Sequence, residues 1–164
     1  KFKIKFIFSR KYKEKYYSYL ISVLPKIYSR WYSTLQVNLL KRKYEQANNF
    51  EYDLVIINRF DNFLLNYLDL TEIDPAKIYS SKWDCGKNIF FKKRYYDNKH
   101  TQDYWYISSS KIINIFSELF NFLKDYSPCS HRASFQHIKK YLGLGKMAYI
   151  LELKKDYELF RRIK

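Results

Sequence analysis

Four consecutive large apolar residues, Leu54 to Ile57, constrain the fold of this chain more than any other feature of its sequence. Acidic residues precede the run, and polar residues follow it at Asn58, Arg59 and Asp61. A short, unbroken Val/Ile/Leu run with polar ends is typical of a strand buried on both faces. Open α/β sheets bind their ligands beyond the carboxyl ends of such strands. The sequence therefore predicts a functional site at these three polar residues.

The rest of the chain alternates between strand-like and helix-like patterns, which predicts an α/β layered fold with a largely parallel sheet. Further strands are expected over residues 1–8, 78–79, 103–107 and 147–151. Helices are expected over residues 11–24, 31–46, 110–123, 130–142 and 156–163, the first of them ending before Pro25 and the fourth closed by Gly143. Residues 80–102 have no regular period, and their aromatic side chains favour an ordered loop.

Length and composition indicate one globular domain over residues 1–164, long enough to bury a core. The formal net charge is +15, and it is unevenly distributed. Both ends of the chain are basic, while residues 51–128 carry 10 Lys/Arg against 11 Asp/Glu. A basic surface attracts polyanions, which include nucleic acids and nucleotide phosphates. The alternative is a solvated surface of a protein from a Lys-rich proteome.

Two features bear on where the protein works. Its two cysteines, Cys85 and Cys129, form no disulfide framework, which favours a reducing compartment such as the cytoplasm. No apolar run approaches the roughly 20 residues of a transmembrane helix, and no signal-peptide pattern is present. We therefore expect a cytoplasmic protein without a transmembrane segment.

An ordered series of short motifs links the helix before the apolar run to the strand around residue 105. It consists of Trp31-Tyr32-Ser33, Lys43-Tyr44-Glu45, Asn48-Asn49-Phe50, Tyr52-Asp53-Leu54-Val55-Ile56, Arg59-Phe60-Asp61 and Asp103-Tyr104-Trp105-Tyr106-Ile107-Ser108-Ser109. In order and spacing, this series resembles a family of GT-A-type glycosyltransferases found in bacterial polysaccharide loci and large DNA viruses. The resemblance covers roughly residues 30–142.

The resemblance implies a GT-A-like, mostly parallel sheet flanked by helices, and transfer of a sugar from a nucleotide sugar to a glycan or similar acceptor. It assigns donor binding to Asn58, Arg59 and Asp61, with Asp61 also toward a divalent metal, Mn²⁺ or Mg²⁺. Asp103 is the implied general base for the acceptor hydroxyl. Acceptor contacts are expected at three further residues, Trp83, Asp84 and Trp105.

The chain departs from the family pattern at two points. Ile57 replaces the first Arg of a paired Arg-x-Arg motif, so any phosphate contact of that Arg is lost. In addition, the residues from Lys1 onward do not include the nucleotide-binding strand with a Gly/Arg turn with which members of this family usually begin. We expect the chain either to be the carboxyl-terminal part of a larger enzyme or to lack part of the family's activity.

Other interpretations of the same residues remain open. Arg59 and Asp61 can simply pair across their turn, and a strand Trp such as Trp105 more often belongs to the core. The Lys- and Tyr-rich first 50 residues suit a nucleic-acid surface, although they carry no recognised motif. A non-catalytic scaffold derived from a glycosyltransferase is a third alternative. Cys129, His131 and His137 are only a weak zinc pattern, because they lack a second paired spacing.

Overall fold

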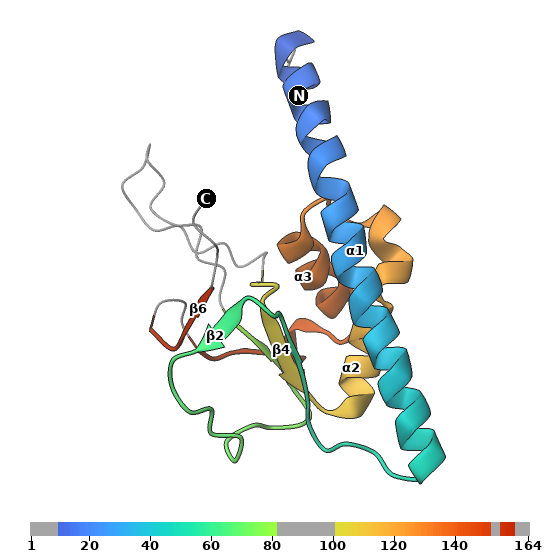
Figure 1. Cartoon of the computed structure of the whole chain (residues 1–164), viewed down its shortest axis with the longest axis vertical. Coiled ribbons are helices and arrows are strands. Elements are labelled where there is room, and N and C mark those ends of the chain that lie inside the picture. The colour runs from blue at the N-terminus through green and yellow to red at the C-terminus, as the bar shows by residue number, and fades with distance from the viewer. Residues whose placement is uncertain (1–9, 82–100, 152–154, 160–164) are drawn as a thin grey trace, which may run out of the picture.

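A computed structural model describes residues 10–81, 101–151 and 155–159 of the chain. One long helix, α1 (Arg10–Asn48), runs along one side of the molecule, as Figure 1 shows. Three shorter helical segments lie beside it: α2 (Ser110–Ser117), the 3-10 helix η1 (Glu118–Asp125) and α3 (Ser130–Tyr141). The helices cover one face of the sheet, and the exposed face of α1 points away from the strands.

The main sheet has four strands in the order β1 (Val55–Asn58), β4 (Trp105–Ser108), β3 (Ile78–Ser80) and β5 (Met147–Tyr149). Only β3 and β5 are parallel, while β4 is antiparallel to both of its neighbours. The predicted GT-A-like, mostly parallel sheet is therefore wrong. A parallel pair needs a long crossover, usually a helix. Residues 59–77, which connect β1 to β3, form no helix. This part of the chain therefore lacks the strand–helix–strand unit from which parallel sheets are built.

The apolar run at Leu54 to Ile57 does form a strand, but not one buried on both faces. β1 lies at the edge of the sheet, and exposed and half-buried residues alternate along it. Ile57 packs against the core beneath the helices, whereas the side chain of Ile56 is 49% exposed. An apolar run places apolar side chains on both faces of a strand, but the position of that strand in the sheet depends on pairing with distant residues.

The two helices predicted on either side of Pro25 are one continuous helix, α1. Proline inside a helix removes one backbone hydrogen bond, to the carbonyl of residue i−4, which is Ile21 here. Both Pro25 and Ile21 are exposed, so water can satisfy the carbonyl. The next turns bury Ile27, Trp31 and Leu35, and this packing keeps the helix intact beyond the proline.

Several elements agree with the sequence pattern and two do not. The strands at 78–79, 103–107 and 147–151 and the helix at 130–142 are confirmed, with Gly143 at φ 81° beyond the last helix. The helix predicted over 110–123 tightens into a 3-10 helix after Ser117. Residues 157–159 form strand β6 (Tyr157–Leu159), paired with β2 (Asn62–Leu64), in place of a predicted helix. The strand predicted at 1–8 and residues 82–100 of the predicted loop lie outside the described residues.

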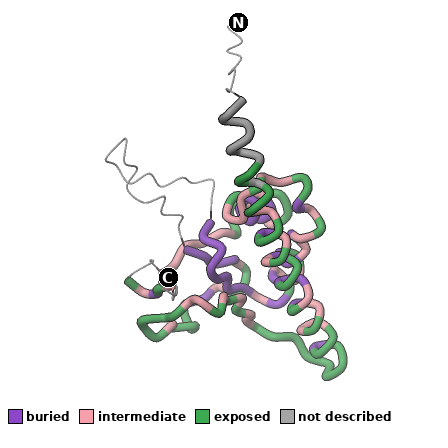
Figure 2. Tube along the Cα trace, turned by 45° about the horizontal axis from the view of Figure 1, so that its top comes forward, coloured by how far each residue is buried: buried purple, intermediate pink, exposed green. Residues whose placement is uncertain are grey.

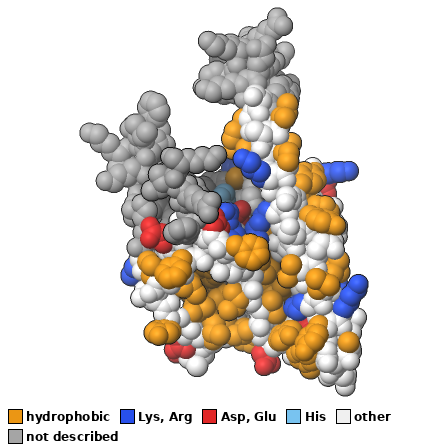
Figure 3. All heavy atoms as spheres, in the orientation of Figure 1, with side chains coloured by type: hydrophobic (Ala, Val, Ile, Leu, Met, Phe, Trp, Pro, Cys, Tyr) orange, Lys and Arg blue, Asp and Glu red, His pale blue; other side chains and the backbone are white. Residues whose placement is uncertain are grey.

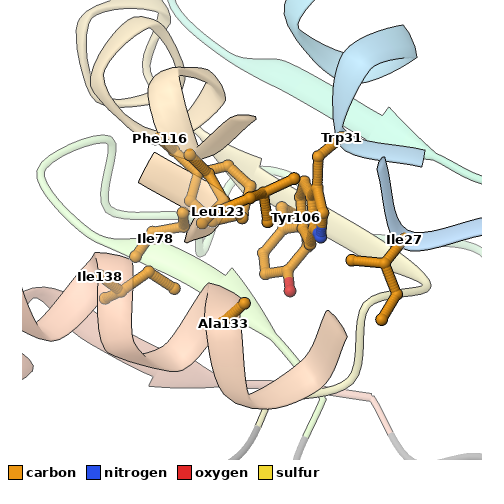
Figure 4. Packing of buried hydrophobic residues seen from close by; sticks show 9 residues of the cluster. Ile27, Trp31, Ile78, Tyr106, Phe116, Leu123, Ala133 and Ile138 are labelled. Carbon is orange, nitrogen blue, oxygen red and sulfur yellow. The ribbon is translucent and has the colours of Figure 1, made fainter. Parts of the chain in front are cut away.

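The core has two parts, one on each face of β4. Tyr106 points toward the helices and packs with Trp31 and Phe116, whose rings lie 5.6 Å apart and nearly perpendicular (Figure 4). Trp105 and Ile107 point the other way, into a cluster that contains Tyr157 of β6. The buried residues are accordingly concentrated around the middle strands of the sheet (Figure 2). β4 is therefore the strand on which both halves of the core are assembled.

Candidate functional site

The turn after β1 is fixed to the beginning of β4 by backbone hydrogen bonds. The amide of Arg59 donates to the carbonyl of Tyr104 at 3.1 Å, and the amide of Asn62 donates to the carbonyl of Arg59 at 3.1 Å. The Arg59 side chain therefore starts directly beside Tyr104, and its guanidinium carbon lies 5.3 Å from the centre of the Tyr104 ring. An arginine over an aromatic face gains a cation–π contact, which orients the guanidinium.

Arg59 and Asp61 form a bidentate pair across this turn. Nε of Arg59 donates to Oδ1 of Asp61 and Nη2 donates to Oδ2, both at 2.7 Å. The remaining nitrogen, Nη1, lies 3.8 Å from Oδ1 of Asp103. The hydrogen bonds with Asp61 raise the pKa of Arg59. The guanidinium thus lies between two carboxylates that are far apart in the sequence.

Asp103 is the most deeply buried member of this group, with its side chain 7% exposed. Its Oδ1 makes no hydrogen bond within the described part of the chain, but it lies 3.4 Å from Nδ1 of His131 as well as near Arg59. A buried carboxylate is stabilised mainly by neighbouring positive charge. Oδ1 of Asp103 is therefore held between an arginine and a histidine.

His131 reaches the site from the first turn of α3. Its Nδ1 lies 3.1 Å from the backbone nitrogen of Asp103 and 3.0 Å from the carbonyl oxygen of Thr101. Nδ1 accepts a hydrogen bond from the Asp103 amide in one tautomer and donates to an oxygen in the other. The ring also packs edge-on against Tyr104, with 5.9 Å between ring centres. The sequence analysis treated His131 only as a weak zinc ligand, and no sequence spacing connects it with Asp103.

Arg30, on α1, is the second arginine of the site. Its Nη2 donates to the backbone carbonyl of Asp103 at 3.0 Å, and Nη1 donates to the Thr34 hydroxyl at 3.4 Å. Its guanidinium lies 5.6 Å from the centre of the Trp31 ring. Burial lowers the pKa of Arg30, and the Asp103 carboxylate opposes that shift. The sequence analysis missed this residue, although its spacing from Ile27 and Thr34 places it on the buried side of the helix.

We refer to Arg30, Arg59, Asp61, Asp103 and His131 as the Arg–Asp–His cluster. Figure 3 shows Lys/Arg, Asp/Glu and His side chains gathered beside α1. The sequence analysis expected Arg59 and Asp61 to form a site, with Asp103 as a second acid, and the structure brings these three residues together.

The other predicted contact residues lie elsewhere. Asn58 is exposed, and its side-chain oxygen accepts a hydrogen bond from Asn62 at 2.7 Å. Trp105 is only 3% exposed and packs edge-on against Tyr157, so neither face of its ring is open to an acceptor sugar. Trp83 and Asp84 lie outside the described residues.

The residues do not fit a divalent metal at Asp61 in this arrangement. Both carboxylate oxygens of Asp61 already accept hydrogen bonds from Arg59, whose positive charge occupies the space between Asp61 and Asp103. A metal ion would have to displace the guanidinium. Among the described residues, no three His, Cys, Asp or Glu side chains are grouped to hold a metal, which includes Cys129, His131 and His137.

Two open hollows on the surface lie away from the cluster. One, of about 640 Å³, is lined by residues at the carboxyl end of α1 and just beyond it, such as Glu45 and Phe50. The other, of about 440 Å³, lies beside Lys77 and Lys146. Neither is lined by a residue of the Arg–Asp–His cluster. We base the site on the cluster because buried charges and convergent polar groups identify function better than an open hollow without them.

Comparison with known proteins identifies no relative: no family model, no curated protein and no solved structure matches the chain. Within residues 10–81, 101–151 and 155–159, no helix is both long enough and apolar enough to cross a membrane.

Proposed function

We propose that this chain is a glycosyltransferase, or the part of one, that transfers a sugar from a nucleotide-sugar donor to a hydroxyl of a glycan or similar acceptor. One observation supports this most. The residues to which the family resemblance assigns the donor, Arg59 and Asp61, meet the residue assigned to the acceptor, Asp103, around a single guanidinium group. A transfer reaction requires this proximity, because donor and acceptor must meet at one point.

The donor side is the Arg59 guanidinium. When the bond between the sugar and the diphosphate breaks, its electron pair passes to the diphosphate oxygen, which gains negative charge. A planar guanidinium donates two parallel hydrogen bonds to such an oxyanion and remains charged at any pH at which the protein is folded. The backbone hydrogen bond from Arg59 to Tyr104 and the contact with the Tyr104 ring hold this guanidinium beside Asp103 before the transfer.

The acceptor side is Asp103. In an inverting displacement, the acceptor oxygen forms a bond to the anomeric carbon while the bond to the diphosphate breaks. The hydroxyl proton passes to Oδ1 of Asp103, and the nucleoside diphosphate leaves with the electron pair. His131, 3.4 Å from that oxygen, orients the carboxylate. Positive charge is supplied by the arginines in this scheme, since a divalent ion at Asp61 would first have to displace Arg59.

The direct test is a panel of nucleotide sugars incubated with the chain and mixed glycan acceptors, with release of nucleoside diphosphate as the measured quantity. Each donor is tested in EDTA and in Mn²⁺. Asp103→Asn removes the proton acceptor at nearly constant size, and we expect it to lower turnover about a hundredfold or more. Asp125→Asn, an exposed acid at the end of η1, is the matched control and should leave turnover unchanged.

Two results would contradict the proposal. The first is failure of every donor to bind in either condition. The second is binding of generic RNA or DNA that weakens steeply with salt and is unaffected by Asp103→Asn, which would indicate a nucleic-acid-binding protein. A chain that shows neither behaviour and captures a protein partner would be a scaffold.

A further inference from the structure

Arg30 is the least satisfied charged group of the Arg–Asp–His cluster. Its Nε is buried without a hydrogen-bond partner, and its guanidinium has no ion pair with a carboxylate of the described residues. Its two hydrogen bonds go to neutral oxygens, those of Asp103 backbone and Thr34. A partly buried cation without a direct counter-ion is costly, and charged groups perturbed in this way cluster at functional sites.

The second observation is that both arginines converge on one residue. Arg30 contacts the backbone carbonyl of Asp103 from α1, and Arg59 approaches its carboxylate from the turn after β1. Burial is the main cause that lowers the pKa of Arg30, the Asp103 carboxylate opposes this shift, and the like charge of Arg59 adds to it. An anion bound between the two arginines would relieve the repulsion between them.

The third observation concerns Asp61. Its carboxylate presents two coplanar oxygens to Nε and Nη2 of Arg59, both at 2.7 Å. Two oxygens of a phosphate group bind a guanidinium in the same parallel geometry. Asp61 therefore occupies the position on Arg59 that a phosphate would take, and a phosphate binding there must displace it.

We propose that Arg30 and Arg59 form a diphosphate-binding pair that works without a divalent metal. One guanidinium binds each phosphate, and Asp61 serves as the counter-ion that Arg59 exchanges for the ligand. The identity of the diphosphate as part of a nucleotide sugar rests on the proposed function. The binding chemistry itself depends only on the two guanidinium groups and is therefore tested separately.

The test is calorimetric titration of the whole chain with inorganic pyrophosphate and with uridine diphosphate, in EDTA. Arg30→Gln should weaken pyrophosphate binding at least about tenfold, the usual loss for one hydrogen bond to a charged group. Arg42→Gln is the matched control, because Arg42 lies on the same helix, is 41% exposed and lies 3.8 Å from the carboxylate of Glu118, which is not part of the cluster. It should leave the affinity unchanged.

Asp61→Ala separates this proposal from a metal site at Asp61. If Asp61 is a competing counter-ion, its removal frees Arg59, and pyrophosphate binding in EDTA should become tighter. If Asp61 holds a metal, the same change should abolish Mn²⁺-dependent binding and leave the EDTA value unaltered. The substitution lies on a half-exposed turn, and circular dichroism before titration verifies that each variant is folded.

The unmodified chain alone can overturn the proposal, which does not depend on the folding of any variant. Absence of pyrophosphate binding in EDTA together with binding in Mn²⁺ would refute the arginine pair while leaving the glycosyltransferase proposal intact. Equal affinities for Arg30→Gln and Arg42→Gln would also refute it. Conversely, Arg30-dependent pyrophosphate binding by a chain that turns over no nucleotide sugar would support the pair and refute the glycosyltransferase.

Discussion

The hydroxyl of Tyr126 lies 3.1 Å from Nδ1 of His137, a residue of α3 that is not part of the Arg–Asp–His cluster. On the other side of the ring, Nε2 lies 3.0 Å from the carbonyl oxygen of Ile115. Since a carbonyl only accepts, Nε2 carries the proton and Nδ1 accepts from Tyr126 in the neutral ring. His137 is 1% exposed, so both nitrogens are satisfied without charge.

This relationship predicts a loss of stability in mild acid. Burial lowers the pKa of His137, which the hydrogen bond to Ile115 only partly offsets. The folded state thus prefers neutral His137, and its contribution is complete above the unfolded pKa of about 6.5. As the pH falls below that value, the free energy of unfolding should decrease, with a slope approaching about 1.4 kcal/mol per pH unit.

Urea denaturation at several pH values between 7.5 and 5.5 measures this dependence. His137→Gln is the informative variant, because glutamine can both donate and accept but does not titrate. The difference in pH dependence between the two proteins is due to His137 alone, because His100 and His131 are present in both. Parallel curves for the two proteins over this range would contradict the prediction.

Glu45 holds α1 to the beginning of α2. Its Oε1 accepts from the Ser110 hydroxyl at 2.6 Å and from the Tyr52 amide at 3.1 Å, and its Oε2 accepts from Lys41 at 3.0 Å. Burial raises the pKa of Glu45, but these hydrogen bonds outweigh it, and the net pKa is lowered. In Glu45→Gln, the side-chain NH₂ group, itself a donor, faces either Lys41 or the two donors of Ser110 and Tyr52, so hydrogen bonds are lost. We expect a loss of about 1–3 kcal/mol in the free energy of unfolding.

The measurement is urea denaturation monitored by circular dichroism at neutral pH. Glu118→Gln is the control, because that carboxylate is 37% exposed, accepts a hydrogen bond from the neighbouring Asn121 side chain and lies 3.8 Å from Arg42. Its substitution should change stability by less than about 0.5 kcal/mol. Similar losses for the two variants would mean that Glu45 does not hold the helices together.

Pro25 lies inside α1 at an exposed position, where it removes one helical hydrogen bond. Because the packing of Ile27 and Trp31 already fixes the helix on both sides, Pro25→Ala should increase the free energy of unfolding, by up to about 3 kcal/mol. Thermal unfolding of this variant is compared with Pro75→Ala, an exposed proline in a turn, where no gain is expected. Equal or lower stability of Pro25→Ala would show that the helix is interrupted there.

Arg59→Lys should separate stability from ligand binding. Lysine keeps the charge but cannot form the two parallel hydrogen bonds to Asp61. Since both side chains of the pair are 30% exposed, we expect the loss in unfolding free energy to stay below about 1 kcal/mol. Pyrophosphate affinity should fall at least about tenfold, because the bidentate contact is the one used for phosphate. A large loss in unfolding free energy with unchanged pyrophosphate affinity would show that Arg59 stabilises the fold and does not bind phosphate.

Local elements were largely predictable from the sequence because they depend on residues close together in the chain. The apolar spacing in residues 130–142 and the Gly143 that follows them predicted α3 and its end correctly. The order and direction of the strands were not predictable in this way. β1 pairs with β4 across about 50 intervening residues, and nothing in Val55–Asn58 alone distinguishes an edge strand from a central one.

The candidate site, too, was predictable where it depends on local sequence and not where it depends on contacts between distant residues. Arg59, Asp61 and Asp103 were recognised because they lie at strand ends, where ordered motifs are visible in the sequence. Arg30 and His131 come from helices, and only the folded chain brings them to Asp103. Trp105 belongs to the core because β4 is covered on both faces, a consequence of its central place in the sheet.

The unbroken course of α1 has a consequence for how the site can change. Arg30 and Glu45 lie on the same continuous helix, and one inserted residue rotates the side chains that follow it by about 100° around the helix axis. An insertion between them would turn either the arginine away from Asp103 or the carboxylate away from Ser110. The number of residues between Arg30 and Glu45 therefore cannot change while both side chains keep their partners.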